Sequence, residues 1–189
     1  MEQRILHPKM NFTVRSARDI AAEWWTLPED AGVYGLLFRD GAAWLDACGY
    51  GTFSQRKPAL IDGYELLSVG STTRLNLQKR ISHHVFGDSR VSSLRRTVGA
   101  LFGGAVGLRP YGDPGVCNFR FDDEGEAWLT NFLIDNALFA FRHSPEPAVE
   151  EMWLIKRHKP PFNIQGLERT RFAKHLLALR REMADEASR

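Results

Sequence analysis

Cysteine, long apolar runs and net charge are all scarce in this chain. The two cysteines among 189 residues, Cys48 and Cys117, lie far apart and outside any CxxC motif, which argues against a disulfide framework and against a four-ligand zinc site. The longest nearly apolar stretch, residues 97–108, is too short for a membrane span, which needs about 20 residues. The first residues carry charge and proline where a secretory signal would be apolar. The sequence therefore favours a reduced, cytoplasmic protein outside the membrane.

The net charge of +2 points to no class of partner by itself. The charges are unevenly distributed, however, because residues 71–110 hold seven basic and one acidic residue, whereas residues 111–150 hold two basic and eight acidic residues. A chain with one basic and one acidic face suits the docking of a polyanion on the basic side. Two solvated helical faces would explain the same pattern equally well.

The length and a hydrophobic fraction of 43% fit one domain with a buried core. Apolar patterning predicts strands at residues 32–38, 64–70 and 137–142, and helices at residues 16–27, 75–86, 92–102, 122–136, 146–156 and 167–187. Residues 40–62 are rich in glycine, proline and small side chains and are predicted as a loop. This order predicts an α+β fold with a small three-stranded sheet, antiparallel or mixed, flanked by helices.

Four short segments carry the features that bear on function. They are Gly32-Val33-Tyr34 in the first strand, Ser68-Val69-Gly70 in the second, residues 78–84 on a basic helix, and residues 151–163 on a helix that runs into a Pro-Pro pair and an asparagine. In this order they resemble the GIY-YIG nuclease family, and the last segment is most similar to the nuclease module of bacterial excision-repair incision proteins. The resemblance covers about residues 31–163.

The resemblance implies a metal-dependent DNA endonuclease and assigns four catalytic residues. Tyr34 would be the general base toward water, Arg80 would hold the scissile phosphate by charge-assisted hydrogen bonds, and His84 would bond the phosphate or the nucleophile. Glu151 would hold one Mg²⁺ or Mn²⁺ ion per site, because Mg²⁺ takes few protein ligands and keeps several waters. Other interpretations remain open: a packed aromatic for Tyr34, a structural histidine for His84, and a metal ligand at Glu150 instead.

Ser68, Gly70 and Asn163 would support the site. Ser68 is a departure from the family pattern, because a second tyrosine is expected at this position. Tyr64 lies four residues earlier on the same predicted strand, which would place it on the same face. The loop over residues 70–80 is also longer than expected. The missing phenol leaves a second hypothesis open, namely a catalytically weak or inactive nucleic-acid-binding module of the same fold.

The basic block predicts a phosphate-tracking surface beside the site. Its residues are Arg74, Lys79, Arg90, Arg95 and Arg96. Such contacts fix the position of a nucleic acid without reading its bases. The alternatives are simple solubility, or pairing with the acidic residues 122–126.

The predicted domain organisation has three parts. Residues 1–30 form a helical extension, residues 31–163 form the nuclease-like domain with a charged insert at residues 90–136, and residues 164–189 form a C-terminal helix. Little of the chain lies outside the matched segment, which favours a stand-alone restriction- or repair-type enzyme acting on double-stranded DNA. A homodimer would permit double-strand cleavage, and nothing in the sequence supports one.

Overall fold

The computed structural model describes residues 11–73, 75–112 and 118–188. Over these residues the fold is α+β, as predicted, but its main sheet has five antiparallel strands rather than three. The strands occur in the order β1 (Thr13–Ser16), β7 (Ala137–His143), β2 (Gly32–Phe38), β4 (Tyr64–Ser71) and β3 (Leu60–Ile61). A second, two-stranded sheet pairs β5 (Pro110–Tyr111) with β6 (Arg120–Phe121).

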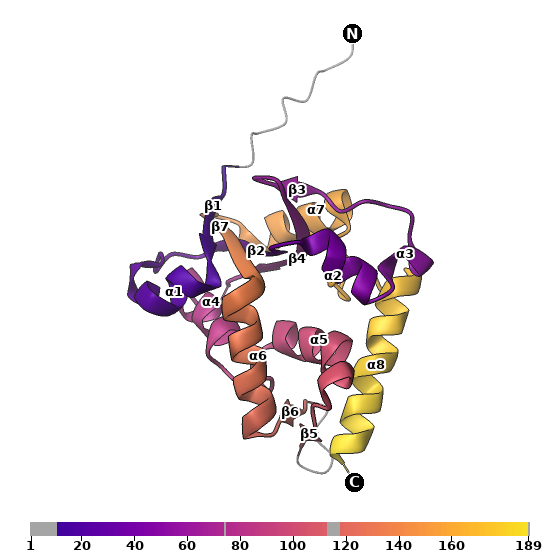
Figure 1. Cartoon of the computed structure of the whole chain (residues 1–189). Coiled ribbons are helices and arrows are strands. Elements are labelled where there is room, and N and C mark those ends of the chain that lie inside the picture. The colour runs from indigo at the N-terminus through magenta and orange to yellow at the C-terminus, as the bar shows by residue number, and fades with distance from the viewer. Residues whose placement is uncertain (1–10, 74, 113–117, 189) are drawn as a thin grey trace.

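The helices surround the main sheet, as Figure 1 shows. They are α1 (Ala17–Glu23), α2 (Gly41–Ala47), α3 (Tyr50–Phe53), α4 (Leu77–Val85), α5 (Ser93–Phe102), α6 (Asp123–Asn136), α7 (Pro147–His158) and α8 (Arg171–Ala187), with 3₁₀ turns η1 (Trp24–Thr26) and η2 (Gly103–Val106). Within the described ranges, no helix combines the length and the apolar character needed to cross a bilayer.

The sequence prediction missed β5 and β6 of the second sheet and, in the main sheet, the two short strands at its edges. β1 pairs with β7, and β3 pairs with β4 over only two residues. Strands this short leave almost no alternation to detect, so their existence depends on the neighbouring strand rather than on local sequence. The predicted loop over residues 40–62 also contains α2 and α3, and α2 begins directly after Asp40, which adopts a left-handed backbone with φ 54°.

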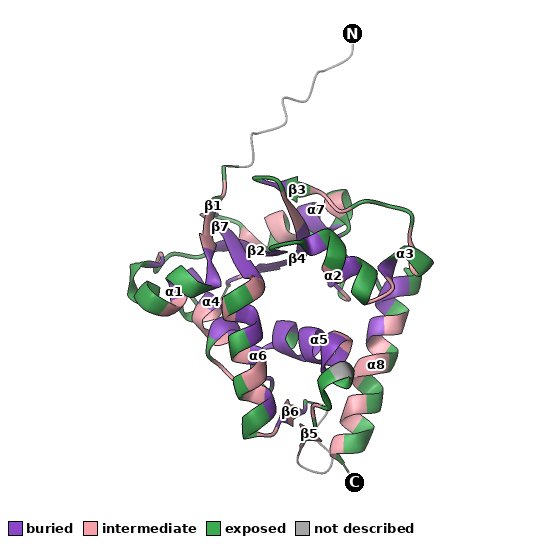
Figure 2. Cartoon of the chain, viewed as in Figure 1, coloured by how far each residue is buried: buried purple, intermediate pink, exposed green. Residues whose placement is uncertain are grey.

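The main sheet separates two apolar clusters, and its central strand β2 is buried along its whole length (Figure 2). Alternate side chains of β2 point to opposite faces. Leu36 and Phe38 join the larger cluster with α4, α5 and α6, whereas Val33 and Leu37 join the smaller cluster under α7. Residues from α8 enter both clusters, and β1 extends the same sheet. The described parts of both predicted extensions therefore pack onto the central domain.

A bulge in β4 changes which face its residues occupy. Leu36 pairs with Ser68, but the next residue of β2, Leu37, pairs with Leu66, so β4 contains one extra residue at this point. An extra residue reverses the alternation beyond it. Tyr64 consequently packs against the cluster under α7, and the expectation that it shares a face with Ser68 is wrong.

Candidate active site

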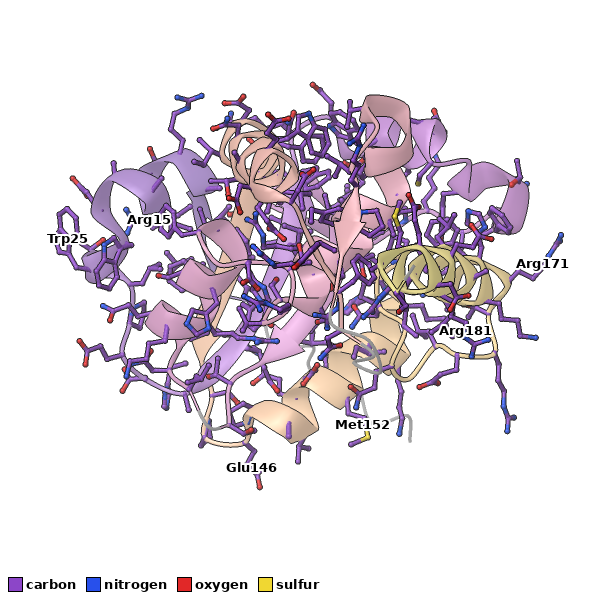
Figure 3. The ribbon with its side chains drawn as sticks, turned by 90° about the horizontal axis from the view of Figure 1, so that it is seen from below. Arg15, Trp25, Glu146, Met152, Arg171 and Arg181 are labelled. Atoms are coloured by element: carbon purple, nitrogen blue, oxygen red, sulfur yellow. The ribbon has the colours of Figure 1, made fainter. Side chains whose placement is uncertain are left out.

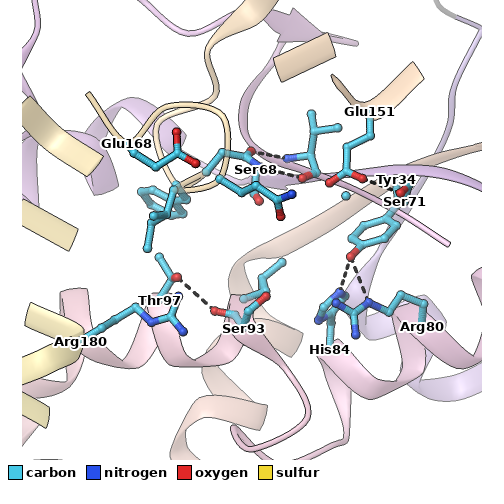
Figure 4. A pocket seen from close by; sticks show the side chains of 17 residues that line it. Tyr34, Ser68, Ser71, Arg80, His84, Ser93, Thr97, Glu151, Glu168 and Arg180 are labelled. Atoms are coloured by element: carbon cyan, nitrogen blue, oxygen red, sulfur yellow. Dashed lines mark hydrogen bonds between the residues drawn. The ribbon is translucent and has the colours of Figure 1, made fainter. Parts of the chain in front are cut away.

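A pocket of about 410 Å³ opens where β2 and β4 meet helices α4, α5, α7 and α8 (Figure 4). It brings together all seven residues that the sequence assigned to catalysis or support: Tyr34, Ser68, Gly70, Arg80, His84, Glu151 and Asn163. Their positions in one pocket are a property of the fold, whereas their chemical roles remain predictions.

Tyr34 lies at the centre of this group. Its side chain is only 6% exposed, and its phenolic oxygen is 3.2 Å from Nε of Arg80 and 2.8 Å from Nε2 of His84. Gly70 faces Tyr34 across the β2–β4 ladder. A Cβ atom at residue 70 would lie 2.3 Å from the phenolic oxygen, so the ring can occupy this position only because the opposing residue is glycine.

The tautomer of His84 depends on how its two ring nitrogens bond Ser92 and Tyr34. Its Nδ1 is 2.8 Å from the hydroxyl of Ser92, and that hydroxyl also accepts the backbone N–H of Arg95 at 3.1 Å. Ser92 is fully buried, and a buried hydroxyl needs an acceptor for its own proton. One neutral imidazole can accept a proton from only one of its two hydroxyl neighbours. With the proton on Nε2, Nδ1 accepts from Ser92 and Nε2 donates to Tyr34, which is the arrangement that a phenolate at Tyr34 requires; with the proton on Nδ1, Nε2 accepts the phenol's proton instead.

Burial sets the protonation states of this pair. Burial lowers the pKa of His84 well below its usual value, and the positive charges of Arg80, His83 and Arg95 lower it further. Burial also raises the pKa of Tyr34, while the charge and hydrogen bond of Arg80 act in the opposite direction. At neutral pH the pair is thus a neutral imidazole and a phenol, with two N–H donors placed to stabilise the phenolate when it forms.

Glu151 and Glu150 have different environments on α7. Glu151 lines the pocket, and its Oε2 accepts a hydrogen bond of 2.5 Å from the hydroxyl of Ser71. Glu150 forms an ion pair with Arg142, whose Nε donates to Glu150 at 2.6 Å. Of the two carboxylates that the sequence left as alternatives, Glu151 is the one that faces the pocket.

The pocket suits a hard cation held by few protein ligands. The described residues contain no group of three or more His, Cys, Asp or Glu side chains arranged to hold a metal ion. Mg²⁺ does not need such a group, because it keeps several of its waters and binds through one or two carboxylates plus substrate phosphate. Glu151, in a pocket with hydroxyl and amide neighbours, fits that requirement.

Asn163 holds the segment that follows α7 against strand β4. Its amide nitrogen donates to the carbonyl of Val69 at 2.9 Å, and its amide oxygen accepts from the N–H of Val69 at 2.7 Å. The backbone N–H of Phe162 also donates to the carbonyl of Leu67. These three bonds satisfy the edge of β4 that faces away from β2, beyond the two residues that pair with β3, and they fix the segment between α7 and α8 beside the pocket.

The predicted phosphate-tracking surface does not form as expected. Arg95 is fully buried and pairs with Glu126 of α6 at 2.8 Å. Arg96 is also buried and donates to the carbonyls of Ser89 and Arg90. The sequence could not show this, because the partners come from another helix or from a neighbouring loop.

The other cations of that predicted surface have different surroundings. Lys79 is exposed. Arg90 is also exposed but forms an ion pair of 3.0 Å with Asp88. Arg74 lies outside the described residues.

Sequence reasoning missed three polar residues that contribute to the pocket or to its supports. Ser71 bonds Glu151, Ser92 orients His84, and Arg180 of α8 lines the pocket. Ser92 also caps the N-terminus of α5. Arg180 is followed by Arg181 on a highly charged helix, and no feature of the sequence separates the two.

The fold and the pocket define a small α+β catalytic domain. Comparison with known protein families matches residues 32–182 to the GIY-YIG catalytic domain. Since this match covers most of the chain, the protein belongs to the GIY-YIG family, whose catalytic domain indicates nuclease activity and a nucleic-acid substrate. Neither the curated proteins nor the solved structures give a significant match.

Proposed function

We propose that this protein is a metal-dependent endonuclease that hydrolyses phosphodiester bonds in double-stranded DNA. The observation that carries the proposal is the convergence of Tyr34, Arg80, His84 and Glu151, from three separate elements, on one polar pocket.

The contacts of Tyr34 support its role as the base. In the proposed reaction the phenol of Tyr34 first releases its proton to solvent. A water then attacks phosphorus and gives its proton to the phenolate, while the bond to the 3′ oxygen breaks and the leaving 3′ oxygen takes a proton from solvent. Burial opposes ionisation of the phenol, so the N–H donors of Arg80 and His84 are needed to make the phenolate accessible. His84 acts through Tyr34 and keeps its own proton.

Arg80 and Glu151 would handle the charge of the phosphate. The Nε–H of Arg80 is held by Tyr34, which fixes the plane of the guanidinium and leaves its terminal nitrogens to bond a phosphate oxygen. A Mg²⁺ or Mn²⁺ ion bound by Glu151 would supply Lewis-acid stabilisation of the charge that develops on the phosphate and the leaving oxygen. Ser71 orients the carboxylate for that task.

One observation favours a second candidate, a binding module with little or no catalysis. Tyr34 is the single tyrosine among the residues that line the pocket, because Ser68 replaces the second motif tyrosine and Tyr64 packs on the other face of the sheet. The pocket would then bind a phosphate without efficient activation of water.

Plasmid nicking by matched variants tests the proposal. Glu151→Gln keeps the size and hydrogen bonding of the side chain but removes the charge that binds metal, and Glu150→Gln is the same change on the neighbouring residue that faces Arg142. We expect nicking that requires Mg²⁺ or Mn²⁺, stops with chelator, falls at least about 100-fold in Glu151→Gln, and changes little in Glu150→Gln. Salt-sensitive DNA binding without any nicking would instead support the binding module.

A further inference from the structure

Arg180 is a cation of the pocket for which the described part of the chain supplies no partner. It lies on α8, beyond the four motif segments, and lines the same pocket as Tyr34 and Arg80. Among the described residues, no acceptor lies within hydrogen-bond or ion-pair distance of its guanidinium. Burial alone lowers the pKa of Arg180, with no acidic group to oppose the effect. A partly desolvated charge without a partner is costly to a folded protein.

The buried arginines nearby are satisfied in full or in part by the protein. Arg95 has the carboxylate of Glu126 and four further acceptors, and Arg96 has two backbone carbonyls. Glu151 and Glu168 also line the pocket but do not pair with Arg180: Glu151 accepts from Ser71, and Glu168 accepts the N–H of Gly166 at 2.7 Å. The surroundings of Arg180 therefore call for an external anion.

The pocket places Arg180 opposite the catalytic group. Figure 4 shows Arg180 reaching from α8 toward Thr97, with Ser93 between it and the group formed by Arg80, His84 and Tyr34. Ser93 and Thr97 are one turn apart on α5, about 6 Å along the helix axis. Burial lowers the pKa of Arg96 to about 10, and the positive charges of Arg180 and Arg80 contribute to the shift, so the two arginines lie near one region of positive potential.

We propose that Arg180 binds a second phosphate of the nucleic-acid strand whose scissile phosphate is held by Arg80. This inference rests on the proposed function and names a further binding residue for it. A guanidinium fork bonds two phosphate oxygens at once, and a strand that crosses the pocket presents one phosphate per nucleotide. The unpaired charge of Arg180 is thereby neutralised only when substrate is bound, so the contact favours binding rather than folding.

Arg181 supplies a matched control. It is the next residue of α8, carries the same charge and is exposed (Figure 3). Binding is measured in a Glu151→Gln background that does not cleave, with a fluorescent DNA duplex at several salt concentrations. Arg180→Gln is expected to raise Kd about tenfold and to reduce the slope of log K against log salt by about one. Arg181→Gln is expected to change Kd less than about twofold, because an exposed charge beside the pocket makes no direct contact.

Kinetics in the cleaving protein give a second measure. Arg180→Gln should raise KM with kcat nearly unchanged, since a contact to a second phosphate stabilises the ground state and the transition state alike. Arg180→Lys retains the charge and loses the fork, so we expect it to retain the salt slope while Kd rises about threefold. If Arg180→Gln fails to fold, the Kd of Arg180→Lys tests the proposal.

The outcomes separate the two proposals. If Arg180→Gln binds like Arg181→Gln, or if Arg180→Lys has the affinity of its parent where only that variant folds, the second phosphate site is wrong. The nuclease would still stand if the unaltered protein cleaves and Glu151→Gln does not. A protein that neither cleaves nor binds DNA overturns the proposed function, and the role of Arg180 falls with it.

Discussion

The interface between α5 and α6 and the catalytic pocket both contain arginines, but they use them differently. Arg95 at the interface is fully buried and paired with Glu126. Arg80 and Arg180 in the pocket have no acidic partner among the described residues, and Arg80 bonds only the phenol of Tyr34 and, at 3.5 Å, a carbonyl. We infer that an arginine whose counter-charge the fold does not supply is the one left to bind a ligand, whatever the local density of charge in the sequence.

The largest contrast between the two regions should appear in stability. Arg95→Met leaves the carboxylate of Glu126 without its buried partner, which typically costs about 3–5 kcal/mol. Arg80→Met removes a weakly bonded, partly exposed cation and should cost less than about 1 kcal/mol. The measurement is the free energy of unfolding in urea. Activity should show the reverse order, with cleavage lost in Arg80→Met and retained by folded Arg95→Met.

A double variant sharpens this test. Replacing both partners, Arg95→Met with Glu126→Gln, removes the uncompensated charge and should recover part of the lost stability. Equal losses of stability in Arg80→Met and Arg95→Met would show that the two arginines do not differ in the way that their contacts indicate.

A pair of glycines probes the same contrast with smaller effects. Gly70 opposes Tyr34 in the pocket, whereas Gly99 lies on α5 with its Cα against Phe121, where a Cβ would come within 2.4 Å of the ring. Gly99→Ala should lower the free energy of unfolding by about 1–3 kcal/mol through overpacking, less a gain of about 1 kcal/mol in helix propensity. Gly70→Ala should displace the phenol and lower kcat about 10- to 100-fold.

Gly99→Ala should therefore have the larger effect on the free energy of unfolding, whereas Gly70→Ala should have the larger effect on cleavage. Urea unfolding and steady-state cleavage on the same two preparations give the comparison. If Gly70→Ala cleaves like the unaltered protein, the position of Tyr34 opposite Gly70 does not matter for the reaction.

Local sequence predicted the interior of the fold well, and the residues that it named for catalysis and support line one pocket. β2 follows a continuous apolar run and begins and ends where the pattern indicates, and the motif segments do converge on one pocket. The edge strands were missed because two to four residues acquire strand structure only from a neighbour. The face of Tyr64 was assigned incorrectly because one extra residue in β4 is invisible to a period-two pattern.

The charges were predicted least well, and the reason is tertiary. The sequence shows Arg95 and Arg96 as the densest part of a basic block, yet the partners of Arg95 on α6 lie about 30 residues away. Arg180 lies among other charged residues of α8, and only packing of that helix beside the pocket distinguishes it. The tertiary contacts of a helix, and not the neighbours of a residue in the chain, determine which arginine lacks an acidic partner.

The smallest expected effect concerns His84, which connects the two regions. Its Nδ1 bonds Ser92 at the start of α5, and its Nε2 bonds Tyr34 in the pocket. Because its pKa is well below 6.5 in the folded state, His84 binds a proton below pH 6.5 in the unfolded chain but not in the native protein. The free energy of unfolding should then fall as pH falls, approaching about 1.4 kcal/mol per pH unit between pH 6 and 5, and this stability is fully present above pH 7.

His84→Gln isolates that contribution, because glutamine can still donate toward Tyr34 and accept from Ser92 but does not titrate. Urea unfolding at pH 7.5, 6 and 5 should show a shallower decline in the variant, whereas His83→Gln, a change at the half-buried neighbouring histidine, should retain the steep decline. Parallel pH profiles for the unaltered protein and His84→Gln would mean that the imidazole accepts a proton in place. Nε2 and Nδ1 would then both donate, so the hydroxyl of Ser92 would accept a hydrogen bond from Nδ1.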